Sequence, residues 1–151
     1  MPFSLLVVSY NCRSVKSSIY EISQLAKKAD IILLQETWLF ENELPLLSNI
    51  SSEHYATGIS AMDSSNGVIT GRPHGGLAIL WRKGISESCQ VVKFEGESRL
   101  MGIKVIVNNS EHFIINCYMP YCSADNLPEF ISPMLVRHTI PHLGWTMSYQ
   151  P

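Results

Sequence analysis

Two continuous apolar runs with a helical pattern between them constrain the fold more than any other feature of the sequence. The first run is Leu5–Ser9 and the second is Ile31–Leu34. Runs without polar alternation are typical of strands that are buried on both faces of a sheet. Apolar residues between the two runs recur at helical spacing and form one stripe: Ile19, Ile22, Leu25, Ala26 and Ala29. Strand, helix and strand in this order predict a right-handed βαβ unit with parallel strands.

The expected helix has signals at both ends. Ser18, followed three residues later by Glu21, fits a capping box at the helix start. Lys27 and Lys28 fall in the last turn, where positive charge complements the helix dipole. The helix is therefore predicted to run from residue 18 to about residue 28.

The chain beyond this unit predicts mainly antiparallel strands. Residues 44–71 are rich in Ser, Asn and Gly and are expected to be mostly loop, with a short strand at 55–58. Asn108–Glu111 fits a hairpin turn, because Asn tolerates the positive φ of tight turns. The remaining strands are expected at 77–81, 89–94, 101–107 and 113–118. This pattern predicts an α/β fold with a mixed sheet and helices outside it.

Composition excludes several classes of protein. Charged residues make up 16% of the chain and the net charge is −2, which argues against a general polyanion-binding module. The four cysteines show no CxxC spacing, so buried thiols are favoured over a zinc site. The sequence has no signal-peptide pattern and no apolar run of membrane-spanning length. We therefore expect no membrane partner and an intracellular location, in the nucleus or the cytoplasm.

The character of the sequence changes near residue 130. Residues 130–151 contain no Asp or Glu, and their apolar residues follow no clean period. We expect residues 1–130 to form the N-terminal part of one domain. Residues 131–151 are expected to be a divergent, poorly ordered tail that does not continue a sheet.

Polar residues at strand ends are the candidates for chemistry. Asn11 follows the first strand and Glu36 the second, so parallel pairing places both at the carboxyl edge of the sheet, where open α/β sheets bind ligands. Glu36 is suited to a hard cation, or alternatively to a surface salt bridge. Asn11 suits either a phosphate contact or an Asx-turn. Tyr118 either orients a phosphate or is an ordinary aromatic at a strand end.

Four segments in a fixed order carry a resemblance to a known family. They are Ser9–Cys12, Leu33–Leu39, Gly71–Trp81 and Asn116–Pro120. Together they resemble the endonuclease/exonuclease/phosphatase superfamily over residues 3–130. The sequences of these segments most resemble those of the endonuclease domains of LINE-type (non-LTR) retrotransposons, which are similar to apurinic/apyrimidinic endonucleases. The resemblance implies the mixed-sheet half of a four-layer α/β sandwich, truncated after its central strands.

The resemblance also implies roles for individual residues. Asn11 matches the active-site asparagine, Glu36 the glutamate that binds Mg²⁺ (or Mn²⁺), and Tyr118 the tyrosine that positions the phosphate. Arg72 and His74 lie in a loop that is expected to contact DNA. Three further basic residues supply positive potential for backbone phosphates, or else form a solvated face: Arg82, Lys83 and Arg99.

Two departures from the family pattern concern catalysis. The sequence has no Gly-Asp-Phe-Asn-like segment, and no Asp-His pair, since His138 and His142 follow Arg137 and Pro141. We therefore expect a fragment of a Mg²⁺-dependent phosphodiesterase, ancestrally a DNA-nicking endonuclease, that is inactive alone. The alternatives are a non-catalytic interaction fragment that self-associates through an uncovered sheet face, and a lipid or phosphoester phosphatase of the same superfamily.

Overall fold

The described part of the protein consists of two β-sheets and a helical layer. The computed structural model describes residues 4–62 and 72–119, together with the strand at residues 136–140. One sheet is five-stranded, with the order β3-β4-β2-β1-β8, and the other is three-stranded, with the order β5-β6-β7. The bounds of the strands are β1 Leu5–Asn11, β2 Ile31–Gln35, β3 His54–Ile59, β4 Leu77–Arg82, β5 Cys89–Lys93, β6 Leu100–Val107, β7 Ser110–Cys117 and β8 Val136–Ile140.

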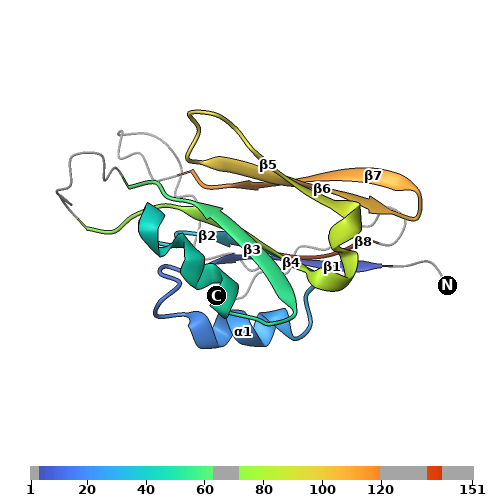
Figure 1. Ribbon diagram of the computed structural model, residues 1–151, viewed down its shortest axis with the longest axis horizontal. Coiled ribbons are helices and arrows are strands. Elements are labelled where there is room, and N and C mark those ends of the chain that lie inside the picture. Colours follow the sequence, from blue (N-terminus) through green and yellow to red (C-terminus); the bar gives the residue numbers. More distant parts are fainter. Residues whose placement is uncertain (1–3, 63–71, 120–135, 141–151) are drawn as a thin grey trace, which may run out of the picture.

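The layers are stacked in the order helices, five-stranded sheet, three-stranded sheet (Figure 1). Helix α1, Ile19–Ala26, and the 3₁₀ helix η1, Glu41–Asn49, lie on one face of the five-stranded sheet. The three-stranded sheet lies on the other face. The α/β fold class with a mixed sheet is confirmed.

The predicted βαβ unit is confirmed. Strands β1 and β2 pair in parallel, with Asn11 opposite Gln35 at their carboxyl ends. The predicted capping box is wrong, because the Ser18 hydroxyl donates to the Cys12 carbonyl at 2.8 Å instead of capping α1. The helix also ends at Ala26, with Lys27 as its C-cap and Lys28 beyond it, so neither lysine lies in the last turn as predicted.

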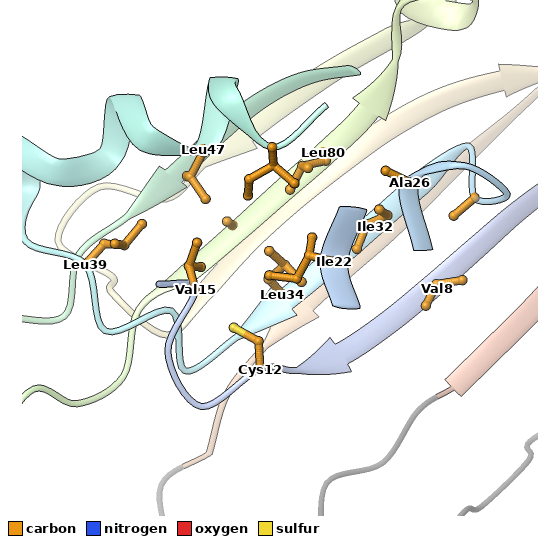
Figure 2. Close-up of a cluster of buried hydrophobic side chains, with 13 residues drawn as sticks. Val8, Cys12, Val15, Ile22, Ala26, Ile32, Leu34, Leu39, Leu47 and Leu80 are labelled. Atoms are coloured by element: carbon orange, nitrogen blue, oxygen red, sulfur yellow. The ribbon is translucent and has the colours of Figure 1, made fainter. Parts of the chain in front are cut away.

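Alternation along the central strands explains why their sequences are continuously apolar. In β2, Ile32 and Leu34 face the helices, whereas Ile31 and Leu33 face the three-stranded sheet. Each strand therefore contributes to two apolar clusters. Figure 2 shows the cluster on the helical side, where residues of α1, η1, β2 and β4 meet: Ile22, Ala26, Leu47, Ile32, Leu34 and Leu80.

The chain crosses from one sheet to the other after β4. The short 3₁₀ helix η2, Lys83–Ser88, follows β4 directly, and β5 begins at the next residue. The strands after residue 88 thus form a second antiparallel sheet and do not extend the first. The predicted hairpin turn is confirmed, since Asn108 and Asn109 have φ values of 49° and 64° and connect β6 to β7.

Two further expectations differ from the structure. Residues 41–49 form η1, although most of this region was expected to be loop. Residues 136–140 were expected not to continue a sheet, but they form β8, which pairs antiparallel with β1. The backbone of this segment pairs with the second edge of β1, and sequence periodicity does not reveal such a pairing. The domain boundary at residue 130 stays a prediction.

Candidate active site

A carboxylate and a phenol from different sheets meet at the carboxyl edge of β2. Glu36 directly follows β2, and Tyr118 directly follows β7. The Tyr118 hydroxyl donates a hydrogen bond to Glu36 Oε1 at 2.7 Å, although 82 positions separate the two residues. Both side chains are partly buried. Two residues that were singled out from the sequence are therefore in direct contact.

The environment of Tyr118 keeps its hydroxyl protonated. Burial, followed by the hydrogen bond and the negative charge of Glu36, raises the pKa of Tyr118 to about 12, and Arg99 opposes this rise. A phenol with this pKa is a hydrogen-bond donor throughout the neutral range. Tyr118 thus restrains one oxygen of the Glu36 carboxylate.

The backbone around Glu36 is held from two sides. Glu36 has a positive φ of 55°, which is uncommon for a residue other than glycine. Its carbonyl accepts a hydrogen bond from the Ser14 amide at 2.8 Å. On the other side, the Thr37 amide donates to the Gly76 carbonyl at 3.3 Å. The loop after β1 and the segment before β4 therefore fix the conformation that presents the carboxylate.

Asn11 lies at the same sheet edge, as the parallel pairing predicted. It is the last residue of β1 and stands opposite Gln35 in the register. Its Oδ1 accepts a hydrogen bond from the Arg13 amide at 3.3 Å, which is the Asx-turn geometry. The turn leaves the Nδ2 group as the donor of this side chain. Its role toward a phosphate stays a prediction.

A pocket of about 140 Å³ opens beside Tyr118. Its lining comes from the segment before β4, from the turn between β5 and β6, and from two single positions: His74, Gly75, Gly76, Ser98, Arg99, Ala61 and Tyr118. His74 is exposed, with Nδ1 3.1 Å from the Arg72 carbonyl oxygen. Arg72 is exposed on the same segment but is not part of the lining. The pocket thus combines an imidazole, a guanidinium and a phenol.

Two of the three other basic candidates lie far from this pocket. Arg82 ends β4, whose other end pairs with Gln35, so it lies at the opposite edge of the sheet. Its Nε forms an ion pair with Asp30 at 3.0 Å, and its Nη2 donates to the Ala29 carbonyl at 3.0 Å. The Lys83 ammonium lies 5.3 Å from the centroid of the Tyr55 ring. Of these three cations only Arg99 lines the pocket, and a contact of Arg82 or Lys83 with phosphates stays a prediction.

Sequence reasoning missed a pair of buried amides behind the site. Gln35 precedes Glu36, and its Nε2 donates to Asn116 Oδ1 at 2.6 Å. Asn116 lies two residues before Tyr118 and is 1% exposed. Both amides stood inside the segments that carried the family resemblance, but their mutual contact depends on how the two sheets pack.

The family model described as the Endonuclease/Exonuclease/phosphatase family matches residues 8–149. The chain belongs to this family. No protein of curated function matches the sequence.

Solved structures share the fold at low sequence identity. The AP endonuclease of Leishmania major superposes with a TM-score of 0.57 at 14% identity, covering 76% of this chain and 40% of that chain. An AP endonuclease from Archaeoglobus fulgidus gives 0.53 at 20% identity, covering 77% and 41%. The APE2 catalytic domain of Xenopus laevis gives 0.53 at 15% identity, covering 79% and 46%. The chain thus spans less than half of the length of these structures.

Endonuclease/exonuclease/phosphatase proteins typically depend on a divalent metal. The ligand atoms available around Glu36 determine which metal ion this site suits. Within residues 4–62 and 72–119, no three His, Cys, Asp or Glu side chains cluster as metal ligands. Zinc and calcium sites need several protein ligands. Mg²⁺ is commonly held by one or two carboxylates together with water and substrate phosphate. Glu36 therefore fits Mg²⁺ or the similar Mn²⁺.

In the described part of the chain, no helix is long and apolar enough to cross a membrane.

Proposed function

We propose that this chain carries the metal-binding and phosphate-orienting part of a Mg²⁺- or Mn²⁺-dependent phosphodiesterase that acts on DNA. The observation that carries this proposal is the Tyr118–Glu36 hydrogen bond of 2.7 Å at the carboxyl edge of parallel strands, beside the pocket that contains Arg99. The order of the four sequence segments favours a relationship to the endonucleases of LINE-type retrotransposons.

Each residue of the site has a distinct proposed role. Glu36 holds the cation, and when bound this cation supplies positive charge for the scissile phosphate. Tyr118 restrains the Glu36 carboxylate through Oε1, which would leave Oε2 available to hold the cation. Asn11 donates to a phosphate oxygen through Nδ2. His74 and Arg99 contact neighbouring backbone phosphates from the pocket.

The proposed role of Arg72 is less direct than the roles of these residues. It is exposed on the segment that carries His74, outside the pocket lining. An exposed arginine at this place is suited to a DNA phosphate further along the backbone. Its contribution is therefore proposed to be electrostatic and dependent on salt concentration.

We further propose that the 151-residue chain does not complete the reaction by itself. Phosphodiester hydrolysis needs a group that activates water and groups that neutralise charge in the transition state. The sequence holds neither the Gly-Asp-Phe-Asn-like segment nor the Asp-His pair. Because catalytic groups act as a unit, the loss of such members lowers the rate by orders of magnitude.

Two assays on the full chain test these proposals. Mn²⁺ binding, measured by calorimetry, is expected for the wild type and lost in Glu36→Gln, while Glu87→Gln, an exposed glutamate of η2, retains it. Equal Mn²⁺ binding by Glu36→Gln would refute the metal site. In a plasmid-nicking assay with Mg²⁺, we expect no difference between the wild type and Glu36→Ala. Nicking that depends on Glu36 would refute the proposal of incompleteness.

A second candidate function is protein association through the three-stranded sheet. The outer face of β6 and β7 exposes large apolar side chains: Leu100, Ile106, Phe113 and Ile115 are 37–54% exposed. Neighbouring apolar side chains of this kind favour association. We propose that the chain self-associates through this face. Light scattering should give a dimer or larger species that Ile115→Lys dissociates, and a wild-type monomer at high concentration would exclude the proposal.

A further inference from the structure

The two sheets are joined behind the site by the hydrogen bonds of two buried amides, Gln35 and Asn116, which we call the amide clasp. Gln35 Nε2 donates to Asn116 Oδ1 at 2.6 Å and lies 3.0 Å from the Ser9 hydroxyl of β1. Asn116 Nδ2 donates to the carbonyls of Leu34 at 3.0 Å and Ala78 at 2.9 Å. Asn116 therefore ties β7 to two strands of the five-stranded sheet, β2 and β4, and Gln35 in turn contacts β1.

The surroundings of the clasp make its geometry strict. Gln35 is 8% exposed and Asn116 is 1% exposed. A buried amide that loses its hydrogen-bond partner destabilises the folded state by about 1–3 kcal/mol, so movements of the sheets that break these bonds are disfavoured. The apolar contacts between the sheets, such as those of Ile103 in the same interface, have no comparable directionality. The amides thus fix the register in which the sheets pack.

The amide clasp lies next to Tyr118 and Glu36, so the packing of the sheets that it fixes also sets the contact between these two residues. Gln35 directly precedes Glu36 in the sequence. Asn116 and Tyr118 are two positions apart, so the side chains of these two residues project to the same side, toward the five-stranded sheet. The Tyr118–Glu36 bond of 2.7 Å spans the same interface one step further along. A displacement of β7 by a fraction of an ångström would lengthen that bond.

We propose that Gln35 and Asn116 are positioning residues that set the contact between Tyr118 and Glu36 and thereby the orientation of the Glu36 carboxylate. The effect on a bound cation rests on the proposed function, whereas the effect on the Tyr118–Glu36 contact does not. A role in stability alone would predict that any comparable loosening of the sheet interface disturbs Tyr118 equally.

The test uses the full chain labelled with fluorotyrosine and observed by ¹⁹F NMR at neutral pH. The Tyr118 signal is assigned with Tyr118→Phe, and Glu36→Gln gives its position when the phenol loses the carboxylate. The clasp is replaced by apolar residues of similar size in Gln35→Met/Asn116→Leu, with Gln35→Met alone as the milder variant. Replacing both partners removes the unsatisfied amide that a single change would leave.

The expected result is a selective movement of one signal. In both clasp variants the Tyr118 signal should move at least half of the way to its position in Glu36→Gln. Ile103→Val, which loosens the apolar interface, and Gln90→Met, which changes an exposed glutamine of β5, should leave the signal in place. An unmoved Tyr118 signal in the clasp variants, or an equal movement in Ile103→Val, would overturn the proposal.

A Mn²⁺ titration of the same samples separates this inference from the proposed function. Paramagnetic broadening of the Tyr118 signal in the wild type, absent in Glu36→Gln, is expected, with an affinity weakened about tenfold in the clasp variants. Absence of broadening in the wild type would refute the metal site and leave the ¹⁹F shift test of the clasp intact.

Discussion

Gly76→Ala is the substitution whose effect follows most directly from the geometry of the site. Gly76 has a φ of +87°, and a Cβ at this position would lie 2.4 Å from Thr37 Oγ1. A left-handed backbone costs a residue with a side chain about 1–2 kcal/mol. Overlap in a packed interior adds about 1–3 kcal/mol. We therefore expect Gly76→Ala to lower the free energy of unfolding by about 2–5 kcal/mol, out of a typical total of about 5–15 kcal/mol.

A double-mutant cycle with Thr37→Ala separates the two contributions. Thr37 Oγ1 is buried and has no hydrogen-bond partner among the residues that the structure describes, so its removal breaks no such bond there. In the Thr37→Ala background the overlap with Oγ1 is absent, and the nearest atom to the added Cβ is the Ile59 carbonyl oxygen at 3.3 Å, so Gly76→Ala should cost the backbone contribution and little more. The expected coupling free energy is about 1–3 kcal/mol.

Gly96→Ala is the matched control for the backbone contribution. Gly96 has a φ of +71°, and a Cβ there would meet nothing within 4 Å. Its substitution should therefore cost about 1–2 kcal/mol, whether or not Thr37 is present. The assay is urea unfolding followed by circular dichroism for each variant. Additivity of Gly76→Ala and Thr37→Ala within about 0.5 kcal/mol would refute the assigned contact.

Three further predictions concern ionisable groups. In EDTA, the absorbance of tyrosinate should show that Tyr118 ionises near pH 12, and its pKa should fall toward 10.0 in Glu36→Gln. Because Tyr118 ionises at lower pH in the unfolded chain, the free energy of unfolding should decrease as the pH rises from 10.0 to about 12. Burial lowers the pKa of His54 below 6.5, so its stabilising contribution should be present above pH 6.5 and lost as the pH falls through the folded-state pKa. A urea midpoint with the same pH dependence in His54→Gln would contradict this. Burial raises the pKa of the Cys12 thiol to about 12, so iodoacetamide should modify the exposed Cys117 and spare Cys12, as mass spectrometry of peptides can show.

The sheet edge that holds Asn11 and Glu36 was predictable because it depends on local sequence pattern. Apolar runs on either side of one helix leave few alternatives to a parallel pair. The strand ends then fix Asn11 and Glu36 at one edge, which the register of β1 with β2 confirms. The alternation of side chains and the asparagine turn between β6 and β7 are equally local.

The roles of polar residues at the sheet interface and edges were not predictable in the same way. Arg82 read as a candidate phosphate contact, yet it forms an ion pair with Asp30, 52 positions away in the sequence. Cys12 and Ser18 read as parts of local patterns, but the Ser18 hydroxyl bonds to the Cys12 carbonyl. Each outcome depends on which buried group needs a partner once the layers are packed.

The sequence by itself determined the βαβ unit, the edge where Glu36 lies, and the family, because each follows from residues close together along the chain or from the order of short segments. Only the tertiary structure decided that Tyr118 reaches Glu36 and that Gln35 bonds to Asn116 across 81 positions. These contacts exist because η2 sends the chain into a second sheet, and buried amides in facing sheets are stable only where they satisfy one another.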